Sequence, residues 1–151
     1  MSNNQPTSIL NNLIETLKDG QEGFRAAAED TESPRLKTLF NEFSLERSQF
    51  AGELQALSRE LGGGEPEKTG SVAGALHRGW IDLKSALSSK DEHAILAECE
   101  RGEDSAVAEY RKAIESNALP ANVLDTVQTQ FIAVQAAHDE VRDLRDAFVP
   151  K

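Results

Sequence analysis

The strongest constraint on how this chain folds is the spacing of its apolar residues. In four long stretches, covering about residues 7–31, 34–62, 91–117 and 120–148, apolar side chains recur every three or four positions. This spacing is typical of an α-helix with one apolar side. Such a helix is unstable alone in water, and four of them can bury their apolar sides around a shared core. The sequence therefore predicts an all-α four-helix bundle that forms a single domain over residues 1–151.

Residues that start and stop helices separate the four stretches. Ser33 is suited to cap a helix that has Pro34 in its first turn. The glycines at 62–64 end the second helix, and Ser89-x-x-Glu92 predicts a capping box at the start of the third. The run Asn117-Ala-Leu-Pro120 divides the third helix from the fourth.

The lengths of the connections predict the topology. The first and third connections are only a few residues long, which makes the helices that they join antiparallel neighbours. The second connection covers about residues 62–88 and is long enough to travel the length of the bundle. We therefore expect two antiparallel hairpins joined by one crossover, with the second and third helices parallel.

The crossover itself carries a further helical pattern over about residues 71–87. Its apolar side includes Trp80, for which two interpretations remain open. Trp80 is either part of a strap that packs on its own bundle or an aromatic anchor at a dimer interface.

Charge and composition narrow the classes of function. The chain carries 26 acidic and 16 basic residues, for a formal net charge of −10. A surface this negative repels phosphate groups, so nucleic acid and membrane surfaces are disfavoured as partners. No apolar run approaches the roughly 20 residues of a membrane span, and the start MSNNQPTSIL does not resemble a signal peptide. We expect a soluble cytoplasmic protein whose single cysteine, Cys99, is a buried apolar residue.

Each apolar stripe is interrupted near the middle of its helix by polar residues. The interruptions fall on Gly20-Gln21, Glu46, Glu103 and His138, and Gln135 lies one turn before His138. Buried carboxylates are costly unless they are paired, hydrogen-bonded or bound to a metal. The sequence therefore predicts a polar layer that is either a hydrogen-bonded network or the ligand set of a metal ion.

Several stretches of the sequence resemble known proteins. The topology and the polar positions resemble the ferritin-like superfamily of ferritins, bacterioferritins and rubrerythrins. The stretches DGQEGFRAAAED, LERSQFAGELQAL, GSVAGALHRGW and ILAECERGED resemble, more narrowly, an uncharacterised bacterial family of four-helix-bundle proteins. The resemblance implies a ferritin-like bundle.

The resemblance also implies where two iron ions would bind. Ferritin-like di-iron proteins carry Glu, E-x-x-H, Glu and E-x-x-H on successive helices. On the last three helices, the corresponding residues here are Glu46 with Gln49, then Glu103, then Gln135 with His138. The first-helix Glu has no clear counterpart, because Gln21 lies on the apolar stripe and Glu22 lies one step off it. Both E-x-x-H pairs are thus broken, and neutral glutamine is a poor replacement for carboxylate or imidazole.

We therefore predict a degenerate di-iron site without catalytic residues or a bound cofactor. The expected function is that of a non-catalytic structural or stress-related binding protein, which acts through its surface or as a small homo-oligomer such as a dimer. In the alternative, Glu46, Glu103 and His138 bind one divalent metal ion, and the protein is a ferritin-like oxidase or an iron- or peroxide-stress protein.

Overall fold

The computed structural model describes residues 5–62, 80, 83–89 and 91–147 of the chain. These residues form five α-helices and no β-strand, as predicted for an all-α bundle. The helices are α1 (Pro6–Asp30), α2 (Pro34–Glu60), α4 (Leu83–Ser89), α5 (Glu92–Glu115) and α6 (Ala121–Ala147). None of the helices described is long and apolar enough to cross a membrane.

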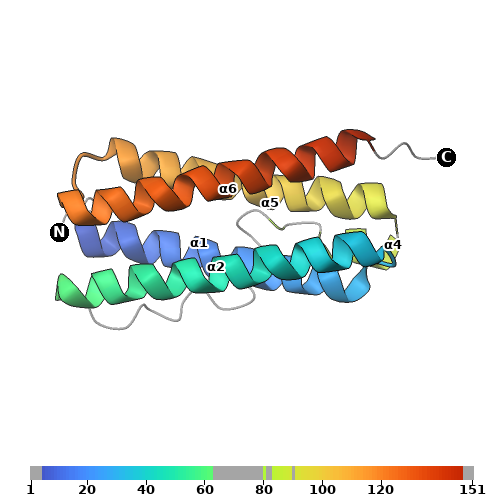
Figure 1. The fold of residues 1–151 in the computed structure, drawn as a ribbon, viewed down its shortest axis with the longest axis horizontal. Helices are drawn as coiled ribbons and strands as arrows, with labels where there is room; N and C mark the ends of the chain where they lie inside the picture. Colours follow the sequence, from blue (N-terminus) through green and yellow to red (C-terminus); the bar gives the residue numbers. More distant parts are fainter. Residues whose placement is uncertain (1–4, 63–79, 81–82, 90, 148–151) are drawn as a thin grey trace.

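The four long helices lie side by side in an elongated bundle (Figure 1). Helix α1 is antiparallel to α2, and α5 is antiparallel to α6, while α2 and α5 run in the same direction (Figure 1). Helix α1 packs against both α2 and α5, and α5 packs against α6. Helices α2 and α6 contact each other far less. The end of α2 and the start of α4 lie at opposite ends of the bundle (Figure 1).

Most predicted helix ends are confirmed. The Ser33 hydroxyl accepts a hydrogen bond from the Leu36 amide at 3.2 Å, and Pro34 opens α2. After α2, Gly62 has a φ of +87°, a conformation that glycine adopts readily and other residues rarely do. Asn117, with a φ of +59°, turns the chain between α5 and α6.

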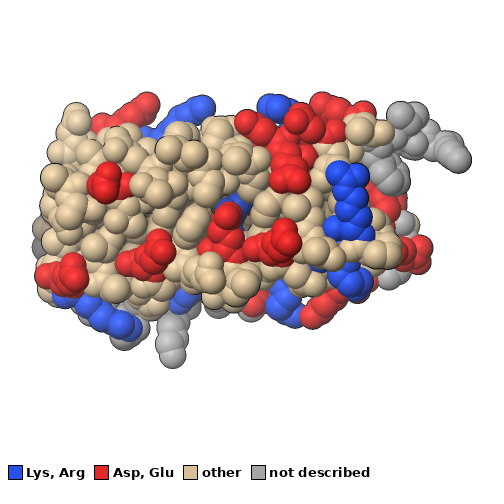
Figure 2. Space-filling model, in the orientation of Figure 1, with Lys and Arg blue, Asp and Glu red and all other residues tan. Residues whose placement is uncertain are grey.

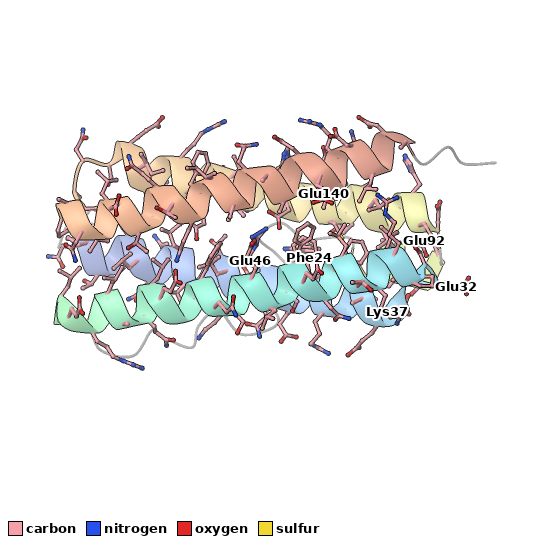
Figure 3. All side chains as sticks on the ribbon, in the orientation of Figure 1. Phe24, Glu32, Lys37, Glu46, Glu92 and Glu140 are labelled. Carbon is pink, nitrogen blue, oxygen red and sulfur yellow. The ribbon has the colours of Figure 1, made fainter. Side chains whose placement is uncertain are left out.

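The predicted capping box at Ser89-x-x-Glu92 is wrong. Asp91 is the residue that caps α5, and its carboxylate accepts a hydrogen bond from the His93 amide at 3.0 Å. Glu92 instead accepts hydrogen bonds from the Thr31 hydroxyl at 2.6 Å and the Glu32 amide at 3.1 Å. Figure 3 shows Glu92 close to Glu32 at this end of the bundle. Glu92 thus fastens the α1–α2 turn to the start of α5, a long-range contact that local sequence does not reveal.

The predicted crossover helix over 71–87 lies mostly outside the described residues. Its last part overlaps α4, which continues to Ser89. Trp80 is described, and only 3% of its surface is exposed. Its ring packs edge-on against Phe24, with ring centroids 5.2 Å apart. Trp80 is therefore a strap residue buried within its own chain, and the interpretation of Trp80 as an interface anchor is wrong.

The buried apolar side chains form two clusters, one towards each end of the bundle. One cluster, which we call the aliphatic cluster, contains residues such as Leu13, Leu54, Val107 and Val127 from α1, α2, α5 and α6. The other, which we call the aromatic cluster, contains the residues Phe24, Ala27, Ala28, Leu36, Phe40, Phe43, Trp80, Leu83, Ala86, Ile95, Leu96, Cys99, Ala137 and Val141. Polar residues lie between the two clusters.

Candidate functional site

A buried arginine is at the centre of the polar layer between the two clusters. The side chain of Arg47 is 1% exposed. Its Nη2 atom donates a hydrogen bond to Glu103 Oε1 at 2.7 Å, and its Nη1 atom donates to Glu46 Oε1 at 3.1 Å. The guanidinium also lies over the Phe24 ring, 5.7 Å from the ring centroid. Figure 3 labels Glu46 and Phe24, the residues on either side of this group. The arginine thus joins α2 to α5 and contacts α1.

The helical register of α2 explains why Arg47 points inward. The buried residues of this helix are Leu36, Phe40, Phe43, Arg47, Ala51, Leu54 and Ser58. They recur every three or four positions, and Arg47 falls within that series. On α1, Gly20 faces the arginine, and a Cβ at that position would lie 3.5 Å from Arg47 Cγ. Gly20 therefore lies in van der Waals range of the aliphatic part of the arginine, which packs against α1.

Burial and charge act in opposite directions on the carboxylates of this layer. Burial raises the pKa of Glu103 above its ordinary value, while the charges of Arg47 and His138 oppose the increase. Burial also raises the pKa of Glu46, again against the effect of Arg47. The guanidinium lies at hydrogen-bonding distance from Glu103 and forms a salt bridge with it. The layer is therefore held together by an internal ion pair.

Two atoms of this ion pair have no hydrogen-bond partner. They are Arg47 Nε and Glu103 Oε2, and both are buried. Groups of this kind destabilise a fold by about 1–3 kcal/mol each unless water satisfies them. The centre of the bundle is therefore less favourable for stability than the apolar clusters on either side.

His138 lies beside this layer but bonds to other residues. Its Nε2 atom is 2.6 Å from Asp104 Oδ1, and its Nδ1 atom is 3.0 Å from Asp139 Oδ1. Burial lowers the pKa of His138, but the hydrogen bonds to Asp139 and Asp104 outweigh that effect and leave the pKa raised. His138 thus connects α6 to α5 through its contact with the Asp104 carboxylate.

The structure brings together only part of the predicted site. Glu46 and Glu103 share one partner, Arg47, and His138 is close enough to influence the pKa of Glu103. Gln49, which the resemblance places at the histidine position of the second-helix E-x-x-H pair, is exposed and points away from the layer. Gln135 donates a hydrogen bond to Asp139 at 3.1 Å.

Gln21, which interrupts the apolar stripe of the first helix, is half-buried. Its backbone carbonyl accepts a hydrogen bond from the Ser44 hydroxyl at 2.9 Å, which joins α1 to α2.

Sequence reasoning missed several buried polar residues, and Arg47 and Gln130 are the largest of them. Arg47 was overlooked because a basic residue in a helix is normally exposed. Its position four residues after Phe43 and four before Ala51 was the available signal. Gln130 is also buried, where it accepts a hydrogen bond from Tyr110 at 2.7 Å and donates one to Glu53 at 2.8 Å. Burial raises the pKa of Tyr110 well above its ordinary value, so its hydroxyl stays protonated as the donor.

The side chains present do not suit a pair of iron ions. Within the part of the chain that the structure describes, no three His, Cys, Asp or Glu side chains form a group that could hold a metal ion. The positive guanidinium of Arg47 lies between Glu46 and Glu103, where it would repel a cation. The donor set also lacks the carboxylates and the second imidazole that two iron ions require.

The described fold and layer define the class of this protein as an all-α bundle whose core is interrupted by a buried Arg–Glu pair. A family model of a domain of unknown function, DUF2383, matches residues 5–116, and the chain belongs to this family. The matched region includes Arg47, Trp80 and Glu103 and ends before α6. No curated protein matches the chain in sequence.

Proposed function

We propose that this protein is a non-catalytic, cytoplasmic member of the ferritin-like superfamily, with a structural or stress-related binding role carried by its surface. The observation that supports this function best is the position of Arg47 between Glu46 and Glu103. These two carboxylates correspond to metal ligands in the di-iron members that the chain resembles. In our proposal the guanidinium supplies the positive charge that the metal supplies in those proteins.

This arrangement favours a structural role over turnover for a physical reason. The guanidinium is a fixed positive charge, so it offsets one of the two carboxylate charges of the layer without a ligand. Its hydrogen bond to Glu103 is charge-assisted and fixed between two helices. A metal ion would have to displace this bond before it could bind.

The alternative function is that of a protein that binds one divalent metal ion through Glu46, Glu103 and His138. It is favoured by the unpaired, buried Glu103 Oε2 atom and by the closeness of His138 to Glu103. In this alternative, the Arg47 side chain would have to turn away from Glu103 on metal binding.

Metal analysis distinguishes the two functions. The protein is purified without a histidine tag, loaded separately with iron(II), manganese and zinc, and freed of unbound metal before measurement. We expect no stoichiometric ion, no gain in melting temperature with metal, and iron(II) oxidation at the rate of buffer alone. Because a ligand that binds only the native state stabilises it, a metal-dependent rise in melting temperature would indicate a specific site.

A triple variant, Glu46→Leu with Glu103→Leu and His138→Leu, is the control. One ion per wild-type chain that is absent from the triple variant would overturn the proposed function. An ion retained by the variant would be bound at the acidic surface and would leave the proposal standing.

A further inference from the structure

The first half of α6 carries far fewer charged residues than the rest of this acidic chain. Between Glu115 and His138, the only ionisable residue is Asp125. The second half of the helix is different, with Asp139, Glu140 and further charged residues up to Asp146. Figure 2 shows the same contrast, because charged side chains gather over the second half of α6 while the first half is mostly free of them.

The uncharged half of α6 presents a continuous exposed stripe. Its members recur every three or four residues along the helix, which places them on one side. They are Asp125, Gln128, Thr129, Ile132 and Ala136. Ile132 is 71% exposed, more than any other large apolar residue in the described part of the chain.

We propose that this stripe of α6 is the contact surface between two copies of the chain, which pair through antiparallel α6 helices. Two-fold symmetry explains the composition of the surface. At a symmetric interface, the same patch meets itself, so a cluster of acidic residues would face an identical cluster and repel it. Amides and hydroxyls can both donate and accept hydrogen bonds, so they can pair with their own copies.

The position of the one acidic residue fits an antiparallel pairing. If Thr129 of one copy faces Ile132 of the other, the same spacing places Asp125 opposite Ala136. The carboxylate then faces a small neutral residue instead of its own counterpart. A second copy meets the requirements of this surface better than a basic partner, because the stripe offers only one charge for such a partner to neutralise.

The contact is small, so the association is expected to be weak. From Asp125 to Ala136 the helix rises about 16 Å, and interfaces of this size belong to the transient class. The formal charge of −10 on each copy opposes association at low ionic strength. Added salt screens this repulsion and leaves the contacts of the neutral stripe intact. The dimer should therefore become stronger with salt.

Analytical ultracentrifugation of the full chain tests the proposal. We expect wild-type protein to shift from monomer to dimer between about 10 and 500 µM, with more dimer at higher salt. Ile132→Asp should remain a monomer over this range. The matched control is Leu45→Asp on α2, because Leu45 is similar in size to Ile132 and is also exposed, at 60%. This variant should dimerise like the wild type. Circular dichroism verifies that both variants are folded.

A cysteine cross-link locates the contact. The native Cys99 is fully buried, so a thiol introduced at position 132 is the accessible one. Ile132→Cys should form covalent dimers with a short bifunctional maleimide, and Leu45→Cys should not. A wild type that stays monomeric throughout the range, or a dimer that persists in Ile132→Asp, would overturn the proposal.

This inference rests on the proposed function in one respect, because both assume that the protein acts through its surface. Metal binding and self-association are measured separately. Protein that binds an ion and also dimerises through Ile132 would contradict the proposed function alone, and monomeric protein without metal would contradict this inference alone.

Discussion

The two ends of the bundle are filled in different ways. In the aliphatic cluster, side chains from α1, α2, α5 and α6 meet directly, together with residues near the α5–α6 turn. The aromatic cluster also contains Trp80, Leu83 and Ala86, which come from the segment between α2 and α5. Small residues on α1 and α5, including Gly23 and Gly102, create the space that Trp80 occupies. The comparison shows that the four long helices fill the aliphatic end of the core by themselves. The aromatic end also needs side chains from the segment between α2 and α5.

The polar layer between the clusters prevents a continuous apolar core. Arg47 and Glu103 are each 1% exposed, and they pair with each other inside the bundle. A buried ion pair of this kind contributes little net stability, because desolvation offsets the attraction between the charges. Its contribution to the alignment of α2 with α5 is a hypothesis that the variants below test.

Removal of the Trp80 ring should produce the largest effect, and it should be confined to the aromatic end. We expect Trp80→Ala to lower the free energy of unfolding by about 4 kcal/mol, as large aromatic truncations do. Chemical denaturation followed by circular dichroism measures the change. A loss below about 1 kcal/mol would mean that the long helices close this end without the strap.

The second prediction concerns the layer that separates the two clusters. Arg47→Met should lower the free energy of unfolding by about 3 kcal/mol, because it leaves the Glu103 carboxylate buried without its partner. The double variant Arg47→Met with Glu103→Leu should recover most of that loss, since an apolar pair of similar size replaces both charges. A double variant no more stable than Arg47→Met would show that the layer is needed for packing.

The third prediction uses glycines to measure how closely Trp80 fits. A Cβ at Gly102 would clash with the Trp80 ring, and a Cβ at Gly23 would lie 2.6 Å from Trp80 Cδ2. Gly102→Ala should therefore lower stability by about 1–2 kcal/mol, despite the better helix propensity of alanine.

Gly52 on α2 provides the control, because a Cβ there would meet nothing within 4 Å. Gly52→Ala should raise stability by up to about 1 kcal/mol. Thermal unfolding of both variants tests the difference, and equal effects would mean that Trp80 moves aside without cost.

The smallest predicted effect is the pH dependence contributed by His138. Its pKa is raised in the folded protein, so protonated His138 stabilises the fold. This stabilisation is complete below the unfolded pKa of about 6.5 and is lost as pH rises through the folded pKa. Because Asp104 is 63% exposed, we expect a contribution below about 1 kcal/mol.

The measurement compares wild-type protein with His138→Gln from pH 5 to 9. The wild type should be the more stable at pH 5, and the difference should shrink as pH rises. The contribution from Glu46, whose pKa is also raised, has the same sign and is common to both proteins. The charge of His138 lowers the pKa of Glu103, so the difference between the two proteins includes this coupling. A difference that grows with pH would contradict the assignment of His138 as a protonated bridge.

The sequence by itself determined the long helices and the order in which they pack. The local signals are the apolar residues at every third or fourth position and the two turn sequences, Ser33-Pro34 and Asn117 to Pro120. The four long helices begin and end within two residues of the prediction. The length of the link after Gly62 also predicted that α2 and α5 run in the same direction (Figure 1). These features depend on short-range propensity and connection length, which a single chain segment specifies.

Only the tertiary structure decided which polar residues lie inside. The sequence pattern placed Glu46 on the buried stripe and Gln49 beside it, whereas a rotation of α2 by about one residue position, 100°, buries Arg47 and exposes Gln49. In this orientation Arg47 meets its charge partner on another helix, Glu103 on α5. Likewise, Glu92 became a long-range acceptor for Thr31 and Glu32 instead of a cap. The physical reason is that a buried charged side chain is stable only where an oppositely charged or hydrogen-bonding partner is within reach. Such partners come from segments that are distant in the sequence.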